Sequence, residues 1–378
     1  MDAELAAATR APPFGPGDPA PWFEAATPTN PHFHFSTSVG RYMLLGFLPS
    51  PGRQRDAALS AFQAHRSLFN DGKLSAFLVV RDAASIAKAQ NQSPGLRWFL
   101  DADGAVSRLY GALDGAPDAT LGGDAAEHPY WLVLDPSHRV LDRFAISNVA
   151  GLFAALKMLP EVADYAGAEL FAPVLIVPRV FDADLCKRLI ALYEADGGAQ
   201  SGVMRDVDGR TVGVLDDFKR RRDVAIENPD LRKELLARLE RCLMPEIAKV
   251  YQFKVTRIER YMVACYDAAD GGYFRAHRDN ETLGTAHRKF ACSINLNAEE
   301  FEGGDLRFPE FGPRTYRPPT GGAVIFACGL QHEARPVTRG RRYAFLPFFY
   351  DEAGQTVREA NADFLGDPAA QAMARPVP

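Results

Sequence analysis

Two histidines and one aspartate have the residue types and spacing that suit metal chemistry. His277 and Asp279 stand two positions apart, and His332 follows later in the chain. Two imidazoles and one carboxylate are the protein ligands of non-haem iron(II) sites, which keep further coordination positions open. On a β-strand, side chains two positions apart point to the same face, so His277 and Asp279 are expected to enter one pocket. The pattern predicts an oxygenase; the alternative is a surface His-x-Asp and an unrelated histidine satisfied by hydrogen bonds.

An arginine pair, Arg341 and Arg342, follows His332 in a segment with the pattern of a β-strand. Alternation along a strand puts the two guanidinium groups on opposite faces, and the pattern alone does not decide which one points inward. A planar guanidinium near the metal ligands suits the far carboxylate of a dicarboxylate cosubstrate, and a buried one without such a partner would be unfavourable. The alternative is a solvated arginine on an edge strand.

The size and composition of the chain indicate a two-domain globular protein. With 378 residues it is long for one hydrophobic core, and 47% hydrophobic with 24% charged residues is ordinary for a globular protein. The net charge of -5 argues against nucleic acid as a partner, because phosphate binding needs a concentrated positive field. No stretch approaches the roughly 18–20 apolar residues of a membrane span, so no membrane partner is expected.

The N-terminus and the cysteines both favour the cytoplasm. The N-terminus carries Asp2 and Glu4 and lacks the apolar core of a secretory signal. The cysteines are odd in number, form no CxxC motif and have apolar neighbours, which is typical of reduced, buried thiols. None precedes residue 186, and their positions are Cys186, Cys242, Cys265, Cys292 and Cys328.

Residues 15–165 show the alternation of strands and helices expected of an α/β domain. Strands are predicted at 41–48, 75–80, 96–101, 130–135 and 139–144, and helices at 53–70 and 149–165. This order, with Asp101-Ala102-Asp103-Gly104 and Leu134-Asp135-Pro136, resembles the thioredoxin-like fold and its peroxiredoxin branch. The first domain is therefore expected to be thioredoxin-like.

The peroxiredoxin resemblance departs from the family at the reactive residue. Peroxiredoxins need a thiolate cysteine just after the first strand, and this chain has no cysteine before Cys186. Peroxide reduction requires an attacking thiolate, so a thiol peroxidase is excluded. A scaffold, partner-docking or dimerising role is expected for this domain, and a homodimer is a hypothesis.

Residues 170–365 have a different pattern. Helices are predicted at 183–195, with Asp182 as the N-cap, and at 230–250. Many short segments with strand character and turn signals follow, which favour an antiparallel sandwich or barrel. These segments are 255–266, 288–297, 304–308, 322–328, 331–337 and 341–350.

The second domain resembles the prolyl 4-hydroxylase-like branch of the 2-oxoglutarate/iron(II) dioxygenases. The matching segments are Met262-Val263-Ala264-Cys265-Tyr266, Gly272-Tyr273, His277-Arg278-Asp279-Asn280, Glu302-Gly303-Gly304-Asp305-Leu306-Arg307, His332-Glu333-Ala334-Arg335-Pro336-Val337 and Arg339-Gly340-Arg341-Arg342-Tyr343. The resemblance implies a mainly β double-stranded β-helix (jelly roll) with supporting helices.

The resemblance also assigns site residues. It implies that His277, Asp279 and His332 are the iron ligands and that Arg342, rather than Arg341, binds the far carboxylate of 2-oxoglutarate. Tyr266 matches a family tyrosine near the cosubstrate. Asn295 stands where some members place a second tyrosine on the 2-oxoglutarate carboxylate, and an asparagine amide can still donate a hydrogen bond there.

The implied reaction is oxidative decarboxylation of 2-oxoglutarate to succinate and CO₂, coupled to hydroxylation of a C–H bond. The cofactors are then iron(II), 2-oxoglutarate and O₂, with ascorbate as a candidate reductant. Two alternatives remain besides the excluded peroxidase. One is a non-catalytic sensor or scaffold that only binds metal or 2-oxoglutarate, and the other is a cupin-type dioxygenase without a 2-oxo acid, which Arg342 disfavours.

The substrate is a peptide or protein side chain or a small molecule, because specificity lies in loops added to the scaffold. A basic run, Lys219-Arg220-Arg221-Arg222, precedes the first strands of the predicted barrel. Its functional interpretation is recognition of an acidic peptide or a small carboxylate, and the alternative is a solvated basic face. The candidate substrate residues are Arg220, Arg222, Tyr273 and Arg307.

Overall fold

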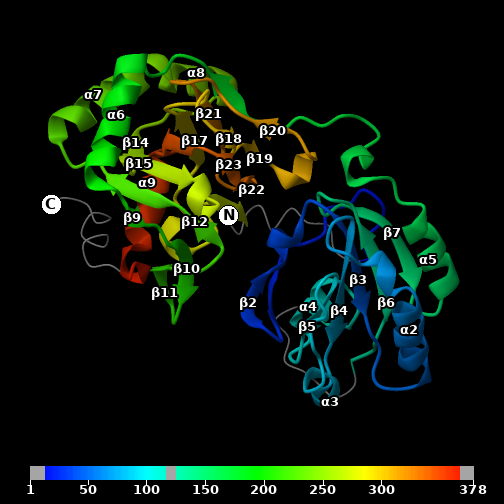
Figure 1. Ribbon diagram of the computed structural model, residues 1–378. Helices are drawn as coiled ribbons and strands as arrows, with labels where there is room; N and C mark the ends of the chain where they lie inside the picture. Colours follow the sequence, from blue (N-terminus) through cyan, green and yellow to red (C-terminus); the bar gives the residue numbers. More distant parts are fainter. Residues whose placement is uncertain (1–12, 116–124, 367–378) are drawn as a thin grey trace. The chain divides into compact units, whose positions relative to one another are not determined.

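The computed structural model describes residues 13–115 and 125–366, which form two compact units (Figure 1). Within these ranges, the first unit contains residues 13–115, 125–171 and 309–312, and the second contains 172–308 and 313–366. The N-terminal residues on which the localisation hypothesis depends lie outside the described ranges. No helix of the described part has the length and apolar character needed to cross a membrane.

The first unit is built on a sheet of five strands with helices packed on it. Its elements are β1 (Glu24–Thr27), β2 (Asn30–His34), β3 (Tyr42–Phe47), α2 (Arg53–Ala64), β4 (Leu74–Val80), α3 (Ala83–Ile86), β5 (Leu96–Leu100), α4 (Ala105–Leu109), β6 (Tyr130–Leu134), β7 (Val140–Ala145) and α5 (Val149–Lys157). The sheet order is β5-β4-β3-β6-β7. β3, β4 and β5 are parallel, whereas β6 and β7 join antiparallel. Every residue of β3, β4 and β6 is buried, because both faces of the sheet are covered.

The predicted strands of this unit agree with the structure to within about two residues, but the predicted helices are shorter. The helix expected at 149–165 ends at Lys157. Pro160 follows shortly after, and a proline disfavours the helical conformation of the residue before it. The helix expected at 53–70 ends at Ala64 and continues only as a short 3-10 turn. The turn of the β6–β7 hairpin is held by the Asp135 carboxylate, which accepts from the main-chain N–H of Ser137 and Arg139.

The second unit contains two larger sheets and a group of helices. Its helices are α6 (Ala183–Asp196), α7 (Pro229–Cys242), α8 (Met244–Tyr251) and α9 (Glu352–Ala360). Its strands are β8 (Leu175–Val177), β9 (Ala199–Gln200), β10 (Val203–Val207), β11 (Arg210–Val214), β12 (Lys219–Arg220), β13 (Arg222–Ala225), β14 (Arg257–Glu259), β15 (Met262–Asp267), β16 (Tyr273–His277), β17 (Phe290–Asn295), β18 (Glu302–Gly303), β19 (Leu306–Arg307), β20 (Thr315–Tyr316), β21 (Ala323–Ala327), β22 (His332–Ala334), β23 (Val337–Arg339), β24 (Arg341–Phe345) and β25 (Phe348–Tyr350).

The major sheet of this unit has the order β14-β25-β17-β24-β15-β13-β9, and β21 joins it through β17. The minor sheet has the order β12-β16-β22-β19-β20. Helices α6, α7 and α8 lie together on one side of the strands (Figure 1), and their buried leucines and isoleucine share one core with the major sheet. Phe326 of the major sheet packs on His332 of the minor sheet, with ring centroids 4.5 Å apart. The site described below lies on the face of the major sheet that the helices leave free.

Several segments that were expected to be continuous are divided, mostly at prolines. The helix predicted at 230–250 is two helices, because the first ends at Cys242 and a second begins at Met244 with Pro245 in its first turn. The strand predicted at 255–266 is divided into β14 and β15 at Arg260, which has a φ of +69°. Pro336 and Pro347 divide the last two predicted strands into β22 and β23, and β24 and β25. By contrast, the predicted N-cap of α6 is confirmed, since the Asp182 side chain accepts from the Leu185 N–H.

Five strands between residues 199 and 225 were not predicted. Their sequences carry many charged residues and lack regular apolar alternation, so the usual strand signal is weak. β12 pairs with β16 in the minor sheet, and β13 pairs with β15 in the major sheet. Arg221 is the residue between them, where one extended segment passes from the first sheet to the second.

All five cysteines are free, and four of them are buried, whereas Cys242 is half-buried. Burial raises the pKa of the Cys186 and Cys265 thiols to about 11. Thiols with such values are protonated and unreactive at neutral pH. The expectation of reduced, buried thiols is confirmed for these positions.

Gly46, in the central strand β3, provides a test of packing in the first unit. A Cβ at this position would lie 2.4 Å from a ring atom of the fully buried Trp131 and 2.9 Å from a Leu78 methyl group. We expect Gly46→Ala to destabilise the first unit by about 1–3 kcal/mol, because the tryptophan has no room to move. Thermal unfolding followed by Trp fluorescence measures this change. Gly72→Ala is the control, since its nearest neighbour is 3.5 Å away; equal effects of both changes would contradict the packing argument.

Candidate metal centre

Three side chains of the second unit converge on one point that can hold a metal ion. His277, Asp279 and His332 each offer one ligand atom, and these atoms lie within 4.8 Å of one another. The Asp279 Oδ1 atom is 3.5 Å from His277 Nε2, and Oδ2 is 3.3 Å from His332 Nε2. The two histidines are directly opposed across the antiparallel pair β16–β22. This cross-strand register brings together residues that are far apart in sequence.

The two imidazoles are oriented so that their Nε2 atoms face the site. Nδ1 of His277 donates to the carbonyl oxygen of Arg275 at 2.7 Å, and Nδ1 of His332 donates to that of Leu330 at 3.0 Å. A carbonyl can only accept, so Nδ1 carries the proton and Nε2 keeps its lone pair. Fixing the tautomer in this way is how ligand histidines are prepared for a metal ion.

Aspartate 279 is not on the strand that carries His277. β16 ends at His277, and Asp279 lies in the turn that follows, so the expected same-face geometry of a continuous strand is wrong. Its main-chain N–H donates to the Cys328 carbonyl at 3.0 Å, and Arg288 donates to its carbonyl oxygen at 3.4 Å. Main-chain contacts on both sides therefore hold the carboxylate toward the histidines.

A buried charge cluster supports this turn, and sequence patterns did not identify it. The Glu259 carboxylate accepts from Arg288 at 2.6 and 3.1 Å and from His287 at 2.6 Å. Burial alone would raise the pKa of Glu259, but Arg288 and His287 hold it well below its usual range. The cluster therefore keeps a fixed guanidinium against the main chain of Asp279.

The electrostatics of the triad suit metal binding. Burial, together with the neighbouring His332, lowers the pKa of His277 to about 4. Burial works against the charged form of Asp279, but the two histidines outweigh it and hold the pKa of Asp279 well below its usual range. A neutral imidazole and an ionised carboxylate are the forms that bind a metal.

Arg342 is the inward arginine of the pair. It is 2% exposed, whereas Arg341 is exposed and pairs with Asp267 and Glu194. The Arg342 guanidinium donates to the Gly304 carbonyl at 2.8 Å, to Ser293 Oγ at 2.8 Å and to Asn295 Oδ1 at 3.3 Å. All three acceptors are neutral, and burial lowers the pKa of Arg342. No carboxylate among the described residues forms an ion pair with it, so a buried cation is left for an anionic ligand.

Tyr266 and Asn295 both lie beside Arg342. Tyr266 is opposite Arg342 across β15 and β24, and its ring centroid is 5.2 Å from the guanidinium carbon. The Asn295 amide nitrogen donates to the Pro318 carbonyl at 2.8 Å, while its oxygen accepts from Arg342. Asn295 therefore orients the arginine through its amide oxygen.

Two buried basic residues near the triad were not singled out from the sequence. Lys219 donates to Ser201 Oγ at 2.6 Å and to the Gly202 carbonyl at 2.9 Å, and its ammonium lies over the Phe274 ring, which stacks on His277. Arg221 forms a two-pronged ion pair with Asp223 and donates to the Tyr266 hydroxyl at 3.4 Å. Alternation along this basic run points Lys219 and Arg221 inward, and strand periodicity could have suggested this.

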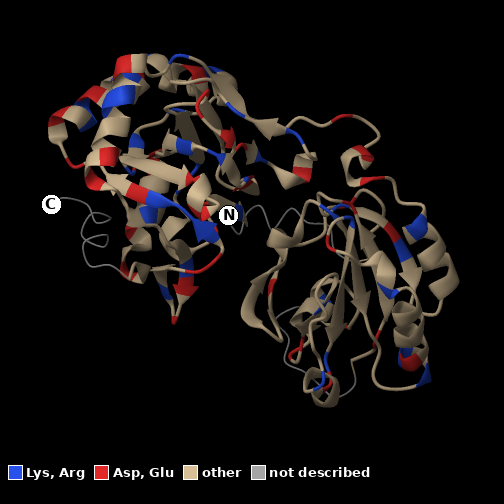
Figure 2. Ribbon diagram, in the orientation of Figure 1, with Lys and Arg blue, Asp and Glu red and all other residues tan. Residues whose placement is uncertain are grey.

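The four candidate substrate residues do not form one group. Arg220 and Arg222 line a cavity described below, and Tyr273 lies beside Arg220 across β12 and β16. Arg307 lies on β19, where it pairs with Glu333 at 3.2 Å. The basic run at β12 and β13 is seen as a blue segment in Figure 2.

Lys219 predicts a pH dependence of stability. Burial lowers the pKa of Lys219 to about 6, and the nearby Arg221 charge contributes. Between about pH 6 and 10 the unfolded chain holds this proton and the folded chain does not, so the free energy of unfolding rises with pH by at most about 1.4 kcal/mol per pH unit. We expect Lys219→Met to lose this slope.

Thermal unfolding of the native chain and Lys219→Met at several pH values between 6 and 9 measures the slope. Lys254→Met, which removes an exposed lysine, is the control and should keep the native pH dependence. Parallel pH profiles for the native chain and Lys219→Met would contradict a depressed pKa at this position.

Comparison with known proteins relates this centre to one family. Residues 261–350 match the family model described as the 2OG-Fe(II) oxygenase superfamily. A PKHD-type hydroxylase of Pseudomonas fluorescens is 34% identical over 128 residues, covering 31% of this chain and 54% of the relative. A PKHD-type hydroxylase of Synechococcus sp. is 26% identical over 126 residues, covering 32% of this chain and 54% of the relative. The chain thus spans about half the length of these relatives.

Solved structures give a weaker likeness. A Pseudomonas putida prolyl-4-hydroxylase has a TM-score of 0.36 at 20% identity, covering 50% of this chain and 95% of that chain. A Trichoplax adhaerens prolyl hydroxylase, solved with a hypoxia inducible factor peptide, has a TM-score of 0.39 at 18% identity, covering 49% and 86%. On the sequence match, the second unit of this chain carries a 2OG-Fe(II) oxygenase domain that is similar to PKHD-type hydroxylases.

Proposed function

We propose that this protein is an oxygenase that couples oxidative decarboxylation of 2-oxoglutarate to hydroxylation of a substrate C–H bond. One observation carries the proposal. A triad of two histidines and one carboxylate occurs in the same unit as a buried arginine that has only neutral acceptors. The triad suits iron(II), and the arginine suits the far carboxylate of 2-oxoglutarate.

In this proposal His277, Asp279 and His332 hold iron(II). The donor set fits the metal, because both Nε2 atoms have free lone pairs and the carboxylate is ionised. Bound iron supplies the activation of dioxygen, which amino-acid side chains cannot perform. Glu259 and Arg288 would then act as positioning residues, since they hold the turn that presents Asp279.

Arg342 binds the far carboxylate of 2-oxoglutarate in this proposal. Ser293 and Asn295 hold the guanidinium in place, so little side-chain entropy is lost when the carboxylate arrives. Tyr266 limits the space on one side of the arginine with its ring. A buried guanidinium at this point also determines which end of a 2-oxo dicarboxylate faces the metal.

Aromatic side chains keep water away from the centre. Phe274 stacks on His277 with ring centroids 3.5 Å apart, and Phe308 and Phe326 flank His332. The side chains of His277 and Asp279 are each 12% exposed, so the centre is mostly shielded but still reached by solvent. The pattern supports a site that admits a substrate group but excludes bulk solvent.

We propose that the first unit is a thioredoxin-like scaffold or docking domain. Its mixed five-stranded sheet, with helices on it, supports this interpretation. In the segment after β3, where peroxiredoxins carry their reactive cysteine and this chain has none, Ser50 donates to the Glu127 carboxylate. The proposal also includes a homodimer formed through this unit and a cytoplasmic location. It includes ascorbate as the reductant that maintains iron(II).

Metal binding should be seen in stability. We expect anaerobic iron(II) at about one hundred times its dissociation constant to raise the thermal unfolding temperature of the second unit by roughly 5–10 °C, since it binds only the folded form. His332→Ala should abolish the shift. His128→Ala, an exposed histidine of the first unit, should keep it. An unchanged shift in His332→Ala would place the metal elsewhere.

Turnover should be seen as succinate. With iron(II), 2-oxoglutarate and air, we expect slow succinate formation even without the substrate, and its loss in His332→Ala. In Arg342→Gln the 2-oxoglutarate concentration for half-maximal rate should rise by about tenfold or more, because a charge-assisted two-pronged contact is lost.

Arg339→Gln, an exposed arginine paired with Glu302, should leave that concentration unchanged. If no succinate forms, anaerobic binding of 2-oxoglutarate decides the outcome. Iron-dependent binding that Arg342→Gln weakens would favour the non-catalytic sensor, and absence of binding would refute the site assignment.

A further inference from the structure

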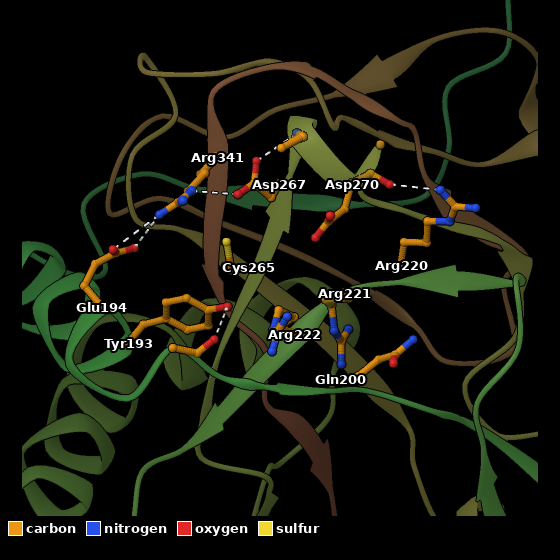
Figure 3. Close-up of a pocket in the computed structure, with 13 residues that line it drawn as sticks. Tyr193, Glu194, Gln200, Arg220, Arg221, Arg222, Cys265, Asp267, Asp270 and Arg341 are labelled. Atoms are coloured by element: carbon orange, nitrogen blue, oxygen red, sulfur yellow. Dashed lines mark hydrogen bonds and ion pairs between the residues drawn. The ribbon is translucent and has the colours of Figure 1, made fainter.

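The second unit contains a cavity of about 840 Å³ that the proposed reaction does not use (Figure 3). It lies where α6 ends, beside β12 and β13 and the turn after β15. Most of the residues that line it are polar or charged, and four of them are arginines: Arg220, Arg221, Arg222 and Arg341. A cavity with so many guanidinium groups is unsuited to an apolar ligand.

Two of the four arginines already have carboxylate partners. Arg341 pairs with Asp267 at 2.7 Å and with Glu194 at 3.3 Å. Arg221 pairs with Asp223 at 2.7 Å. The positive charge of these two groups is therefore balanced within the protein.

Arg220 and Arg222 have no such balance. Arg220 donates to the Asp270 carbonyl at 3.1 Å and lies over the Tyr273 ring, and Arg222 donates to the Gly198 carbonyl at 3.1 Å. Among residues 13–115 and 125–366, neither forms an ion pair with a carboxylate. Each guanidinium has five N–H donors, so most of them are free to meet a ligand.

The remaining lining groups refine the ligand chemistry. The Asp270 carboxylate also lines the cavity and has no ion-pair partner in the described part of the chain, and Arg341 is shared between two carboxylates. The Gln200 amide offers both a donor and an acceptor. Arg220 and Arg222 are therefore the guanidinium groups that a ligand carboxylate would meet, and Asp270 opposes its binding.

We propose that this cavity binds a carboxylate group through Arg220 and Arg222. The carboxylate comes either from an acidic side chain of a peptide or from a free small acid, and the same contacts serve both. The volume is larger than one carboxylate needs, which leaves room for the chain that carries it.

The cavity is connected to the cosubstrate arginine through Arg221. Arg221 lines the cavity, and its guanidinium donates to the hydroxyl of Tyr266, whose ring lies beside Arg342. A carboxylate in the cavity would lie one side chain away from Tyr266.

Calorimetric titration of the full chain tests the binding. The probes are an acetylated, amidated tetraglutamate peptide, its tetraglutamine counterpart, and glutarate as the small acid. All are titrated into Arg342→Gln protein, so that the cosubstrate arginine does not contribute. We expect Arg220→Gln/Arg222→Gln to weaken binding of a carboxylate probe by about tenfold or more, because charge-assisted hydrogen bonds are lost.

Two control variants make the result specific. Lys233→Gln/Arg241→Gln removes two exposed positive charges on α7 and should leave the affinity within about twofold. Asp270→Asn removes the opposing carboxylate of the cavity and should tighten binding, an outcome that misfolding cannot produce. Unfolding temperatures of all variants verify the fold.

The probes distinguish the two sources of the carboxylate. Binding of tetraglutamate without glutarate identifies a peptide site, and binding of glutarate identifies a small-acid site. The proposal is overturned if neither carboxylate probe binds or if tetraglutamine binds equally well. It is also overturned if Arg220→Gln/Arg222→Gln leaves the affinity for the carboxylate probe the same as in the Arg342→Gln protein. None of these titrations needs turnover, so absence of succinate formation would not affect them.

Discussion

The pairing of β16 with β22 is the contact on which the metal centre depends. It sets His277 directly opposite His332 and brings their ring centroids to 4.4 Å. Because side chains alternate along a strand, a slip of one residue would turn one imidazole to the other face and destroy the site. The register shifts once along this pair, between Phe274 and His277, which allows Phe274 to stack on the histidine. The irregularity is therefore part of the site.

The interior of the second unit contains buried guanidinium groups close to the cosubstrate tyrosine. Arg221 and Arg342 are both buried and lie beside Tyr266, and of the two only Arg221 has a carboxylate partner among the described residues. Removing a charge from water is unfavourable by several kcal/mol, so the folded chain pays for these groups in stability. Such a penalty is tolerated where a ligand later neutralises the charge. The excess of positive charge supports anionic ligands for this unit.

The segment of residues 219–225 links the three parts of the second unit that concern function. Its even and odd positions face opposite ways, so Lys219 and Arg221 are buried while Arg220 and Arg222 are exposed; Arg221 also reaches the cavity that Arg220 and Arg222 line. The same segment pairs first with β16 and then with β15. A single strand thus connects the triad strand, the tyrosine beside Arg342 and the surface cavity. Its alternation places the two candidate arginines, Arg220 and Arg222, on the same side of the segment.

Much of the local structure follows from short-range signals. Buried runs such as residues 75–80 and 130–135 specified strands, and Asp182 specified the start of α6. The ends of elements at prolines were predicted less well. The apolar pattern of a helix or strand continues across Pro245 and Pro347, but the regular backbone hydrogen bonding is interrupted there. The strands between residues 199 and 225 carry too much charge to show an apolar period.

The sequence by itself determined which chemistry is available: two histidines, an aspartate and an arginine pair in a pattern that resembles one family. The tertiary structure alone decided how they meet. It placed Asp279 in a turn rather than on the strand, held there by Cys328 and Arg288. It also separated Arg307, paired with Glu333, from Arg220 and Arg222. Cross-strand register and the burial of charges are long-range properties, and no local pattern of residues encodes them.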